Sequence, residues 1–249
     1  MERMRGRVYL VGAGPGDPGL LTLRAAELLA RADVVLYDRL VSRGVLALAR
    51  GAKKVYVGRA VGDDPSHQET TNEAMARYAG SHRVVVRLKG GDPVMFGRGG
   101  EEAQFLRGLG IRYEIVPGIT SGIGSATYAG IPLTHRGHSS SVVFVTGHED
   151  PTKRRESVKW RRLARSADTI VVMMGLSRLP LICEMLESGG LDGSTPAAVI
   201  TDGTTKRQKV IEGDLSSIAS RARRAGARPP AIVVIGGVAS LRGELAWRR

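Results

Sequence analysis

The sequence predicts an α/β fold made of two domains. Short β-branched runs alternate with segments whose apolar residues recur at helical spacing, an order typical of mostly parallel sheets. Glycine-rich loops follow several predicted strands, and ligands of such sheets bind at the carboxyl ends of strands. The alternation is interrupted at residues 131–137 and then starts again. We therefore expect domains at residues 1–136 and 137–249.

The first domain begins with a predicted strand at residues 8–11, which leads into the loop GAGPGD at residues 12–17. Residues 20–30 repeat apolar side chains at helical spacing, with Thr22 as the expected N-cap. The same reasoning predicts strands at 34–37, 55–57, 84–86 and 113–116, and helices at 45–49, 72–79, 101–106 and 120–129.

The most informative stretch runs from Val84 to Leu106 and predicts a strand, a long loop and a helix. Its loop, KGGDPVMFGRGG at residues 89–100, holds five glycines, Pro93 and Asp92. Glycines let a ligand approach the backbone closely, and acids such as Glu101 suit the first turn of the helix that follows. So much turn chemistry in a short span favours a ligand-binding loop over a plain connector.

The second domain repeats the alternation from residue 142 onward. Its expected strands lie at 142–146, 169–173, 197–201, 209–211 and 231–235, and its helices at 160–164, 179–187 and 215–225. The short strand at 209–211 is polar at both flanks and is expected to form half of a hairpin.

The amino-acid composition limits the cellular location and the kinds of binding partner that we expect for this protein. A single cysteine, Cys183, excludes an internal disulfide framework and fits the cytoplasm, and its amphipathic surroundings predict a core residue. No apolar run is long enough for a signal core or a transmembrane helix. The net charge of +13 suits either nucleic acid or a strongly anionic small molecule, but aromatics make up only 4% and do not interleave the basic runs. A nucleic-acid partner is therefore not expected.

Two other kinds of site are weakly supported. The loop after the first strand begins like a dinucleotide fingerprint, but Asp17 replaces its third glycine and Pro15 removes a backbone donor. His135, His138 and His148 lack the cysteines or grouped acids of a metal centre, so no metal site is expected.

Several motifs together resemble the tetrapyrrole methylase family, over nearly the whole chain. The matching pieces are VGAGPGDPGLLTLRA (11–25), YDRLVS (37–42), VVRLKGGDPVMFGRGGEE (85–102), VPGITS (116–121), GIPLTHRG (130–137), VTGH (145–148), MGL (174–176) and DGTTKRQ (202–208). The resemblance implies two α/β domains, a homodimer, and S-adenosylmethionine bound in a cleft between the domains. It also implies methylation of uroporphyrinogen III at C2 and C7, giving precorrin-2 for sirohaem and cobalamin synthesis. A sister methylase acting at another precorrin position is the alternative.

The resemblance also assigns roles to residues. It implies that S-adenosylmethionine contacts small, polar or flexible side chains in the matching motifs, namely Pro15, Gly90, Gly91, Asp92, Met95, Thr120, Ser121, Met174 and Gly203. Arg98 and Arg136 are expected to bind carboxylates of the tetrapyrrole, for which bidentate arginine is well suited. The resemblance implies that Glu101 faces the same substrate and makes it a candidate proton acceptor, and Asp38 matches an acid proposed as a base in the family.

Arg59 departs from the family pattern, which commonly has lysine there as a proton donor. An arginine stays protonated at ordinary pH and is a poor general acid. Either Arg59 supplies a fixed positive charge near Asp38 or the substrate carboxylates, or proton transfer at this position is not needed. We favour the fixed charge and place Arg59 in the catalytic group with Asp38 and Glu101.

Overall fold

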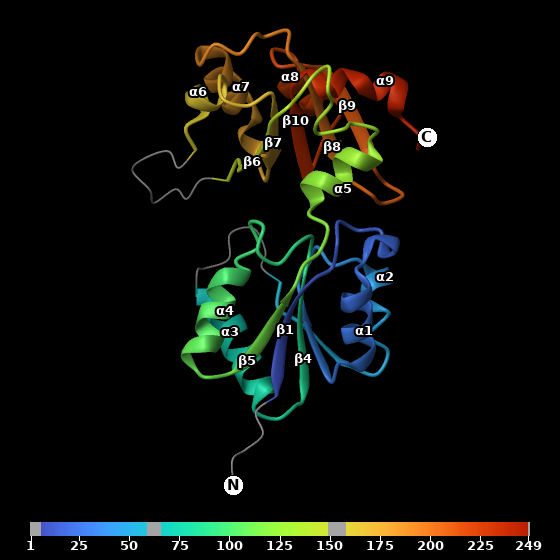
Figure 1. The fold of residues 1–249 in the computed structure, drawn as a ribbon, viewed down its shortest axis with the longest axis vertical. Helices are drawn as coiled ribbons and strands as arrows, with labels where there is room; N and C mark the ends of the chain where they lie inside the picture. The colour runs from blue at the N-terminus through green and yellow to red at the C-terminus, as the bar shows by residue number, and fades with distance from the viewer. Residues whose placement is uncertain (1–5, 59–65, 149–157, 249) are drawn as a thin grey trace. The chain divides into compact units, whose positions relative to one another are not determined.

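A computed structural model describes residues 6–58, 66–148 and 158–248, and its contacts divide the chain into units Met1–Thr120 and Ser121–Arg249. The division falls before α5 (Ser121–Tyr128), whereas the expected boundary at residue 136 lies inside the second unit. The physical reason is that Ala126 and Ala129 pack into the same apolar cluster as Val171 of the second sheet. Each unit is an α/β layer structure (Figure 1).

The first unit is built on a five-stranded, fully parallel sheet in the order β3-β2-β4-β1-β5. Its strands are β1 (Arg7–Gly12), β2 (Val34–Tyr37), β3 (Lys53–Tyr56), β4 (Val84–Lys89) and β5 (Arg112–Val116). Its helices are η1 (Pro18–Leu20, a 3₁₀ turn), α1 (Leu23–Arg31), α2 (Arg43–Leu46), α3 (Ser66–Ala79) and α4 (Gly99–Gly108).

Alternation along the strands gives this sheet two apolar faces. Val86 and Leu88 of β4 pack with α1 and α2, whereas Val85 packs with α3 and α4 on the opposite face (Figure 1). Thr22 is the N-cap of α1, as predicted, because its hydroxyl oxygen accepts a hydrogen bond from the Ala25 N–H.

The second unit also contains a five-stranded sheet, in the order β6-β7-β10-β8-β9. Its strands are β6 (Val142–Thr146), β7 (Thr169–Met173), β8 (Pro196–Thr201), β9 (Lys209–Asp214) and β10 (Ala231–Ile235). Helices α6 (Trp160–Leu163), α7 (Leu179–Ser188) and α8 (Ile218–Arg224) cover one face, and α5 and the 3₁₀ helix η3 (Gly237–Leu241) cover the other. A 3₁₀ turn, η2 (Leu176–Arg178), precedes α7, and α9 (Arg242–Leu245) follows η3.

The expectation of a mostly parallel sheet is wrong for this second unit. Among the described residues of this unit, only β6 and β7 pair in parallel, whereas β10 pairs antiparallel with both β7 and β8. Strands β7 and β8 therefore point the same way, as a helical crossover requires, but the last strand of the chain is inserted between them. Strand β9 pairs antiparallel with β8 and forms the expected hairpin.

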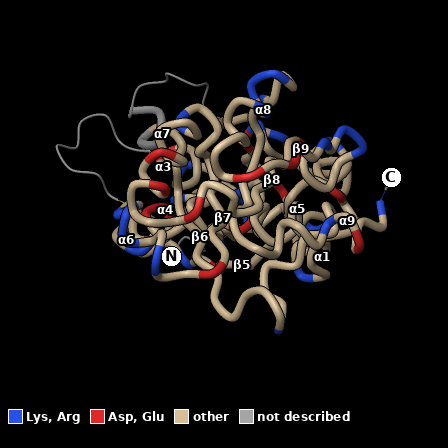
Figure 2. The backbone as a smooth tube through the Cα atoms, turned by 90° about the horizontal axis from the view of Figure 1, so that it is seen from above, with Lys and Arg blue, Asp and Glu red and all other residues tan. Residues whose placement is uncertain are grey.

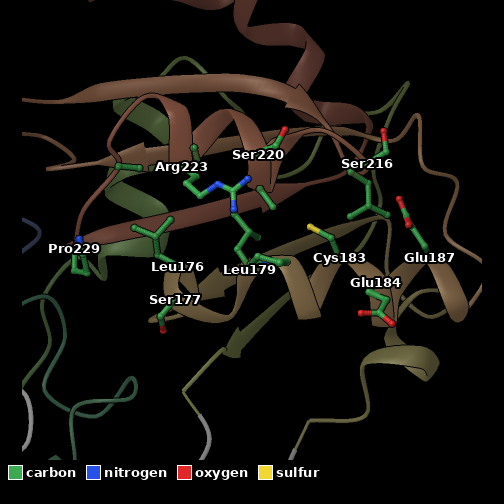
Figure 3. A pocket seen from close by; sticks show the side chains of 15 residues that line it. Leu176, Ser177, Leu179, Cys183, Glu184, Glu187, Ser216, Ser220, Arg223 and Pro229 are labelled. Carbon is green, nitrogen blue, oxygen red and sulfur yellow. The ribbon is translucent and has the colours of Figure 1, made fainter.

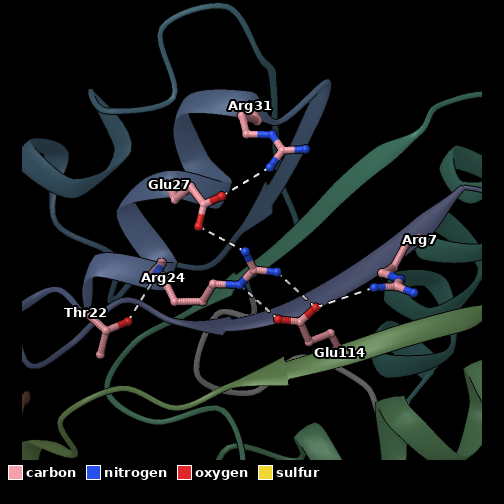
Figure 4. A network of polar contacts seen from close by, with 7 residues as sticks. Arg7, Thr22, Arg24, Glu27, Arg31 and Glu114 are labelled. Atoms are coloured by element: carbon pink, nitrogen blue, oxygen red, sulfur yellow. Dashed lines mark hydrogen bonds and ion pairs between the residues drawn. The ribbon is translucent and has the colours of Figure 1, made fainter.

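An exposed ion-pair network joins α1 to β5 on the first unit (Figure 4). Arg24 reaches both carboxylate oxygens of Glu114, at 3.0 and 3.2 Å, and also contacts Glu27 at 3.0 Å. Because such surface pairs are well solvated, each contributes little to stability. Within the part of the chain that the structure describes, no helix is long and apolar enough to cross a membrane.

Candidate active site

In the first unit the two glycine-rich loops that follow β1 and β4 pair with each other. The Gly91 N–H donates to the Gly14 carbonyl at 2.8 Å, and the Gly14 N–H returns a bond to the Gly91 carbonyl at 3.1 Å. Gly91 has φ +71°, a left-handed conformation that strains any residue with a side chain. The pairing therefore places bare backbone at the carboxyl ends of two neighbouring parallel strands, where ligands of such sheets bind.

The Asp92 side chain connects this pair of loops to the loop that follows β5 through hydrogen bonds. Its Oδ1 accepts hydrogen bonds from the N–H groups of Val94 and Met95, at 2.9 and 3.0 Å, and its Oδ2 accepts one from Gly118 at 3.1 Å. A side chain on Gly118 would collide with the carbonyl of Gly91. The GGDP loop is thus rigidly held, and Asp92 has a structural function that the sequence reading did not anticipate.

Asp38 lies directly after β2, at the same edge of the sheet. Its Oδ1 accepts a hydrogen bond from the Leu40 N–H at 3.0 Å, and Leu40 packs so closely on Gly90 that a Cβ added there would lie 2.7 Å from the Leu40 Cβ. Pro15, Gly90, Gly91 and Met95 are each partly exposed along these loops. The structure therefore brings the loops that hold Pro15, Gly90, Gly91, Asp92 and Met95 close to Asp38.

A buried cluster of charges stands behind Asp38. Glu102 of α4 has no exposed side-chain surface; its Oε1 lies 3.1 Å from Arg87 Nε and its Oε2 2.9 Å from Lys89 Nζ. Arg87 Nη1 is 3.8 Å from Asp38 Oδ2, whose side chain is 23% exposed. Burial, and then the positive charge of Arg87, lower the pKa of Lys89, against the opposing effect of Glu102.

The sequence reading missed this cluster. Lys89 was assigned to the loop after the strand, and Glu102 was given no role of its own. The available signal was the period of two along β4, because Val85, Arg87 and Lys89 alternate with Val86 and Leu88 and so share one face. Two cations on the face that packs against helices require a buried acid nearby.

The substrate-facing residues expected from the sequence lie on the surface. Arg98 has φ +60° just before α4, and its Nε is 3.5 Å from Glu101 Oε1, with both side chains about half exposed. Arg136 is exposed in the loop between α5 and β6 of the second unit. Arg59 lies outside the described residues.

In the second unit, the expected cofactor residues lie at the start of α5 and after the strands β7 and β8. Ser121 begins α5, and a side chain on Gly203 would collide with Ser125 of the same helix. Met174 directly follows β7 with φ +54° and is 51% exposed. A non-glycine residue in this conformation is uncommon and often marks a functional position. Thr120 is buried at the end of the first unit.

A pocket of about 580 Å³ opens elsewhere in the second unit, between α7 and α8 (Figure 3). It is lined mainly by apolar side chains with Arg223 and Cys183, and none of the expected site residues borders it. Cys183 packs in the core as predicted, and burial raises the pKa of its thiol to about 12. Among the described residues no group of three or more His, Cys, Asp or Glu side chains is placed to hold a metal ion.

Comparison with known proteins places this arrangement in one family. A sequence model of the tetrapyrrole (corrin/porphyrin) methylases matches residues 7–219, and the chain belongs to that family. The siroheme synthase of Pseudoalteromonas atlantica is 50% identical over 246 residues, and that of Thiobacillus denitrificans 48% over 249. These matches cover 98% and 100% of this chain but 52% of either relative, so the chain spans about half their length.

Solved structures agree with this assignment. The crystal structure of uroporphyrin-III C-methyltransferase from Thermus thermophilus, in complex with S-adenosylhomocysteine, matches with a TM-score of 0.82 and 43% identity over 95% of this chain and all of that one. A cobalt-precorrin-4 methyltransferase of cobalamin biosynthesis matches with a TM-score of 0.83 and 30% identity, over 94% of this chain and 95% of that one. The fold is thus that of the tetrapyrrole methylases.

Proposed function

We propose that this chain transfers methyl groups from S-adenosylmethionine to C2 and C7 of uroporphyrinogen III, giving precorrin-2 and two molecules of S-adenosylhomocysteine. The observation that carries the proposal is the paired loop at Gly14 and Gly91, fastened by Asp92, in a chain 43% identical to a uroporphyrin-III C-methyltransferase that binds S-adenosylhomocysteine. These loops contain two of the motifs on which the family resemblance is based, GAGPGD and GGDP.

The residues present fit an S-adenosyl ligand. Gly90 and Gly91 are partly exposed and carry no side chain, and Gly91 has φ +71°, so a ligand can approach the backbone of this loop closely; Pro15 and Met95 are partly exposed in the same pair of loops. Thr120, Ser121, Met174 and Gly203 are proposed as further contacts from the matching motifs. When bound, S-adenosylmethionine supplies a methyl group on a positively charged sulfur, which an electron-rich pyrrole carbon attacks in line. A carbon–carbon bond forms as the sulfur–carbon bond breaks.

The protein's own side chains are proposed to bind the substrate and to accept the proton that it loses. Uroporphyrinogen III carries many carboxylates, and Arg98 and Arg136 are exposed and suited to bind them in bidentate fashion. Leu40 and Phe96 are exposed apolar residues beside the same loops and offer a surface for the macrocycle. Asp38 is the proposed acceptor of the proton that the methylated macrocycle loses, and Glu101 is a second candidate. Holding both reactants in line supplies much of the rate enhancement.

A sister methylase acting on a later precorrin is the second candidate function. The cobalt-precorrin-4 methyltransferase has nearly the same TM-score as the uroporphyrin-III enzyme, so backbone shape does not discriminate. Sequence identity does discriminate, because it is 43% with the uroporphyrin-III enzyme and 30% with the cobalt-precorrin-4 enzyme. It therefore favours uroporphyrinogen III as the substrate.

We further propose that the protein acts as a homodimer in the cytoplasm. A single, buried cysteine suits a reducing compartment. Light scattering on the purified protein tests the assembly, and a monomeric mass at working concentration contradicts it.

The decisive experiment is incubation of the protein with uroporphyrinogen III and S-adenosylmethionine. We expect a product that carries two added methyl groups and is heavier by two CH2 units, because each transfer also releases a proton, with the absorption spectrum of precorrin-2 and two equivalents of S-adenosylhomocysteine. Transfer to cobalt-precorrin-4 but not to uroporphyrinogen III would instead establish the second candidate.

A further inference from the structure

The buried cluster formed by Arg87, Lys89 and Glu102 has no part in the reaction as described so far. Its only contact with a proposed catalytic group among the described residues is the ion pair between Arg87 Nη1 and Asp38 Oδ2, at 3.8 Å. The cluster lies on the face of β4 that packs against α3 and α4, where the surrounding cluster is apolar. Its presence there calls for a physical reason.

Stability alone is a poor reason. Removing charges from water is costly, and buried ion pairs replaced by apolar residues of similar volume often leave a protein as stable or more so. Here the three charged side chains are at most 7% exposed, and Leu10, which is paired with Arg87 in the sheet register, belongs to the apolar cluster on this face of the sheet. A functional role for these three residues explains better why the protein keeps buried charges that are costly to desolvate.

The geometry of Arg87 points toward Asp38. Its Nε donates to Glu102 at 3.1 Å and its Nη1 donates to the Leu88 carbonyl at 3.2 Å, so the guanidinium plane is fixed from two sides. Glu102 is itself fixed, because it lies in the first turn of α4, where the helix dipole favours an anion, and Lys89 holds its other oxygen. The guanidinium therefore presents Nη1 to Asp38 without freedom to turn away.

We propose that Arg87 is a positioning residue that fixes the carboxylate of Asp38 for proton acceptance, and that Glu102 and Lys89 hold Arg87 in place. The inference rests on the proposed function, in which Asp38 takes the proton from the methylated macrocycle. Among the described residues, Arg87 of β4 forms the ion pair with Asp38, Lys89 of the same strand interacts with Asp38 electrostatically, and Glu102 of α4 pairs with both cations; Arg59 lies outside the described residues. The backbone N–H of Leu40 also fixes Asp38, because it donates a hydrogen bond to the Asp38 Oδ1.

A double-mutant cycle tests whether Arg87 acts through Asp38. We would measure single-turnover methyl transfer, KM and the calorimetric Kd for S-adenosylhomocysteine in Arg87→Gln, Arg87→Lys, Asp38→Asn and the double variants. Asp38→Asn is expected to slow transfer by roughly 10²–10⁴-fold, the usual worth of a general base. Arg87→Gln is expected to slow it by about tenfold in the native background and not at all in the Asp38→Asn background.

The conservative variant separates positioning from folding. Arg87→Lys keeps the buried positive charge for Glu102 but loses the group that faces Asp38, so its rate should lie between those of wild type and Arg87→Gln. The Kd for S-adenosylhomocysteine should stay within about twofold throughout, because the polar contacts of Arg87 among the described residues are with Glu102, the Leu88 carbonyl and Asp38. If Arg87→Gln does not fold, the same cycle with Arg87→Lys gives the answer.

The matched control is Arg24→Gln, which removes an arginine from the exposed network of the same unit and should leave the rate unchanged (Figure 4). Equal rate losses from Arg87→Gln with and without Asp38 would overturn the proposal and assign Arg87 to folding alone. Full activity of Asp38→Asn would overturn it too, while methyl transfer itself stands. A wild-type protein that binds S-adenosylhomocysteine but methylates no tetrapyrrole would remove the proposed function and the inference together.

Discussion

Arg98 and Arg136 are two exposed arginines that come from different loops, and a polycarboxylate substrate gives both the same use. We predict that Arg98→Ala and Arg136→Ala weaken binding of uroporphyrinogen III far more than binding of S-adenosylhomocysteine. Each change leaves a carboxylate without its partner, at a cost of about 2–5 kcal/mol where the pair is desolvated. The KM for uroporphyrinogen III and the calorimetric Kd for S-adenosylhomocysteine measure the two effects separately. Arg107→Ala, on the exposed last turn of α4, is the control, and unchanged KM in both test variants would remove these arginines from the site.

Gly118 illustrates a residue whose importance lies in what it lacks. A side chain there would collide with the Gly91 carbonyl and with the backbone of Gly12, so all three strand-end loops would have to move. We predict that Gly118→Ala abolishes measurable binding of S-adenosylhomocysteine and lowers the free energy of unfolding.

The comparison for Gly118 is Gly108→Ala, because a Cβ at this helix end meets nothing within 4 Å. That substitution should stabilise the protein by about 0.5–1 kcal/mol and leave ligand binding intact. Urea unfolding and calorimetry distinguish the two outcomes; normal ligand affinity in Gly118→Ala would show that the loops tolerate displacement.

At the scale of elements, the local sequence pattern predicted where strands lie better than which strands pair with one another. The strands at 142–146, 169–173 and 231–235 have the predicted bounds, because β-branched runs bounded by turns leave little choice. The helix predicted at 215–225 begins at Ile218 instead, since the Asp214 carboxylate accepts hydrogen bonds from Ser216 Oγ and the Ser217 N–H and holds those residues in a turn. The insertion of β10 between β7 and β8 depends on long-range pairing that no local window contains.

The candidate site likewise contains features that the local sequence indicates and features that depend on long-range contacts. The glycine loops and Asp92 could be recognised because they lie together in the sequence. Arg87 and Glu102 meet across a strand and a helix, and Asp38 joins them from another strand, so their contact follows from the register of the sheet.

Asp168 connects β7 to the loop that precedes β6 and gives that junction a pH dependence. Its Oδ2 accepts hydrogen bonds from the Ser140 and Ser141 N–H groups, at 2.8 and 3.0 Å, and from the Ser141 hydroxyl at 3.0 Å. These bonds lower the pKa of the carboxyl below its ordinary 3.8 in the folded state. The stabilisation is therefore fully present above pH 3.8 and is lost as pH falls through the lower folded pKa.

We accordingly predict that Asp168→Asn is less stable than wild type at neutral pH and that the difference shrinks in strong acid. Urea unfolding of both proteins across the acid range measures it. Asp33→Asn offers a comparison, because Asp33 makes the analogous bonds to Arg83 and Val84 in the first unit. A difference for Asp168→Asn that stays constant with pH would show that the carboxylate charge has no part in the junction.

Across the whole molecule, a net charge of +13 accompanies a proposed substrate that carries many negative charges. Lysines and arginines gather on exposed elements such as α6 and α8 (Figure 2). Such a field raises the rate at which anions are captured without touching the reacting atoms, and salt screens it over about 8–10 Å.

We predict that neutralising the basic run Arg154, Arg155, Arg161 and Arg162 together leaves kcat within about twofold of wild type but lowers kcat/KM at low salt. The first two residues lie outside the described part of the chain, and the last two are exposed on α6. Because capture by long-range attraction is what changes, the kcat/KM values of variant and wild type should converge as ionic strength rises. Steady-state kinetics with uroporphyrinogen III from about 0.02 to 0.5 M salt, with the Kd for S-adenosylhomocysteine as the control, measure both quantities. A large loss of kcat at saturating substrate in a folded variant would mean that this run binds the substrate directly, and equal salt dependence in both proteins would mean that the field arises elsewhere on the surface.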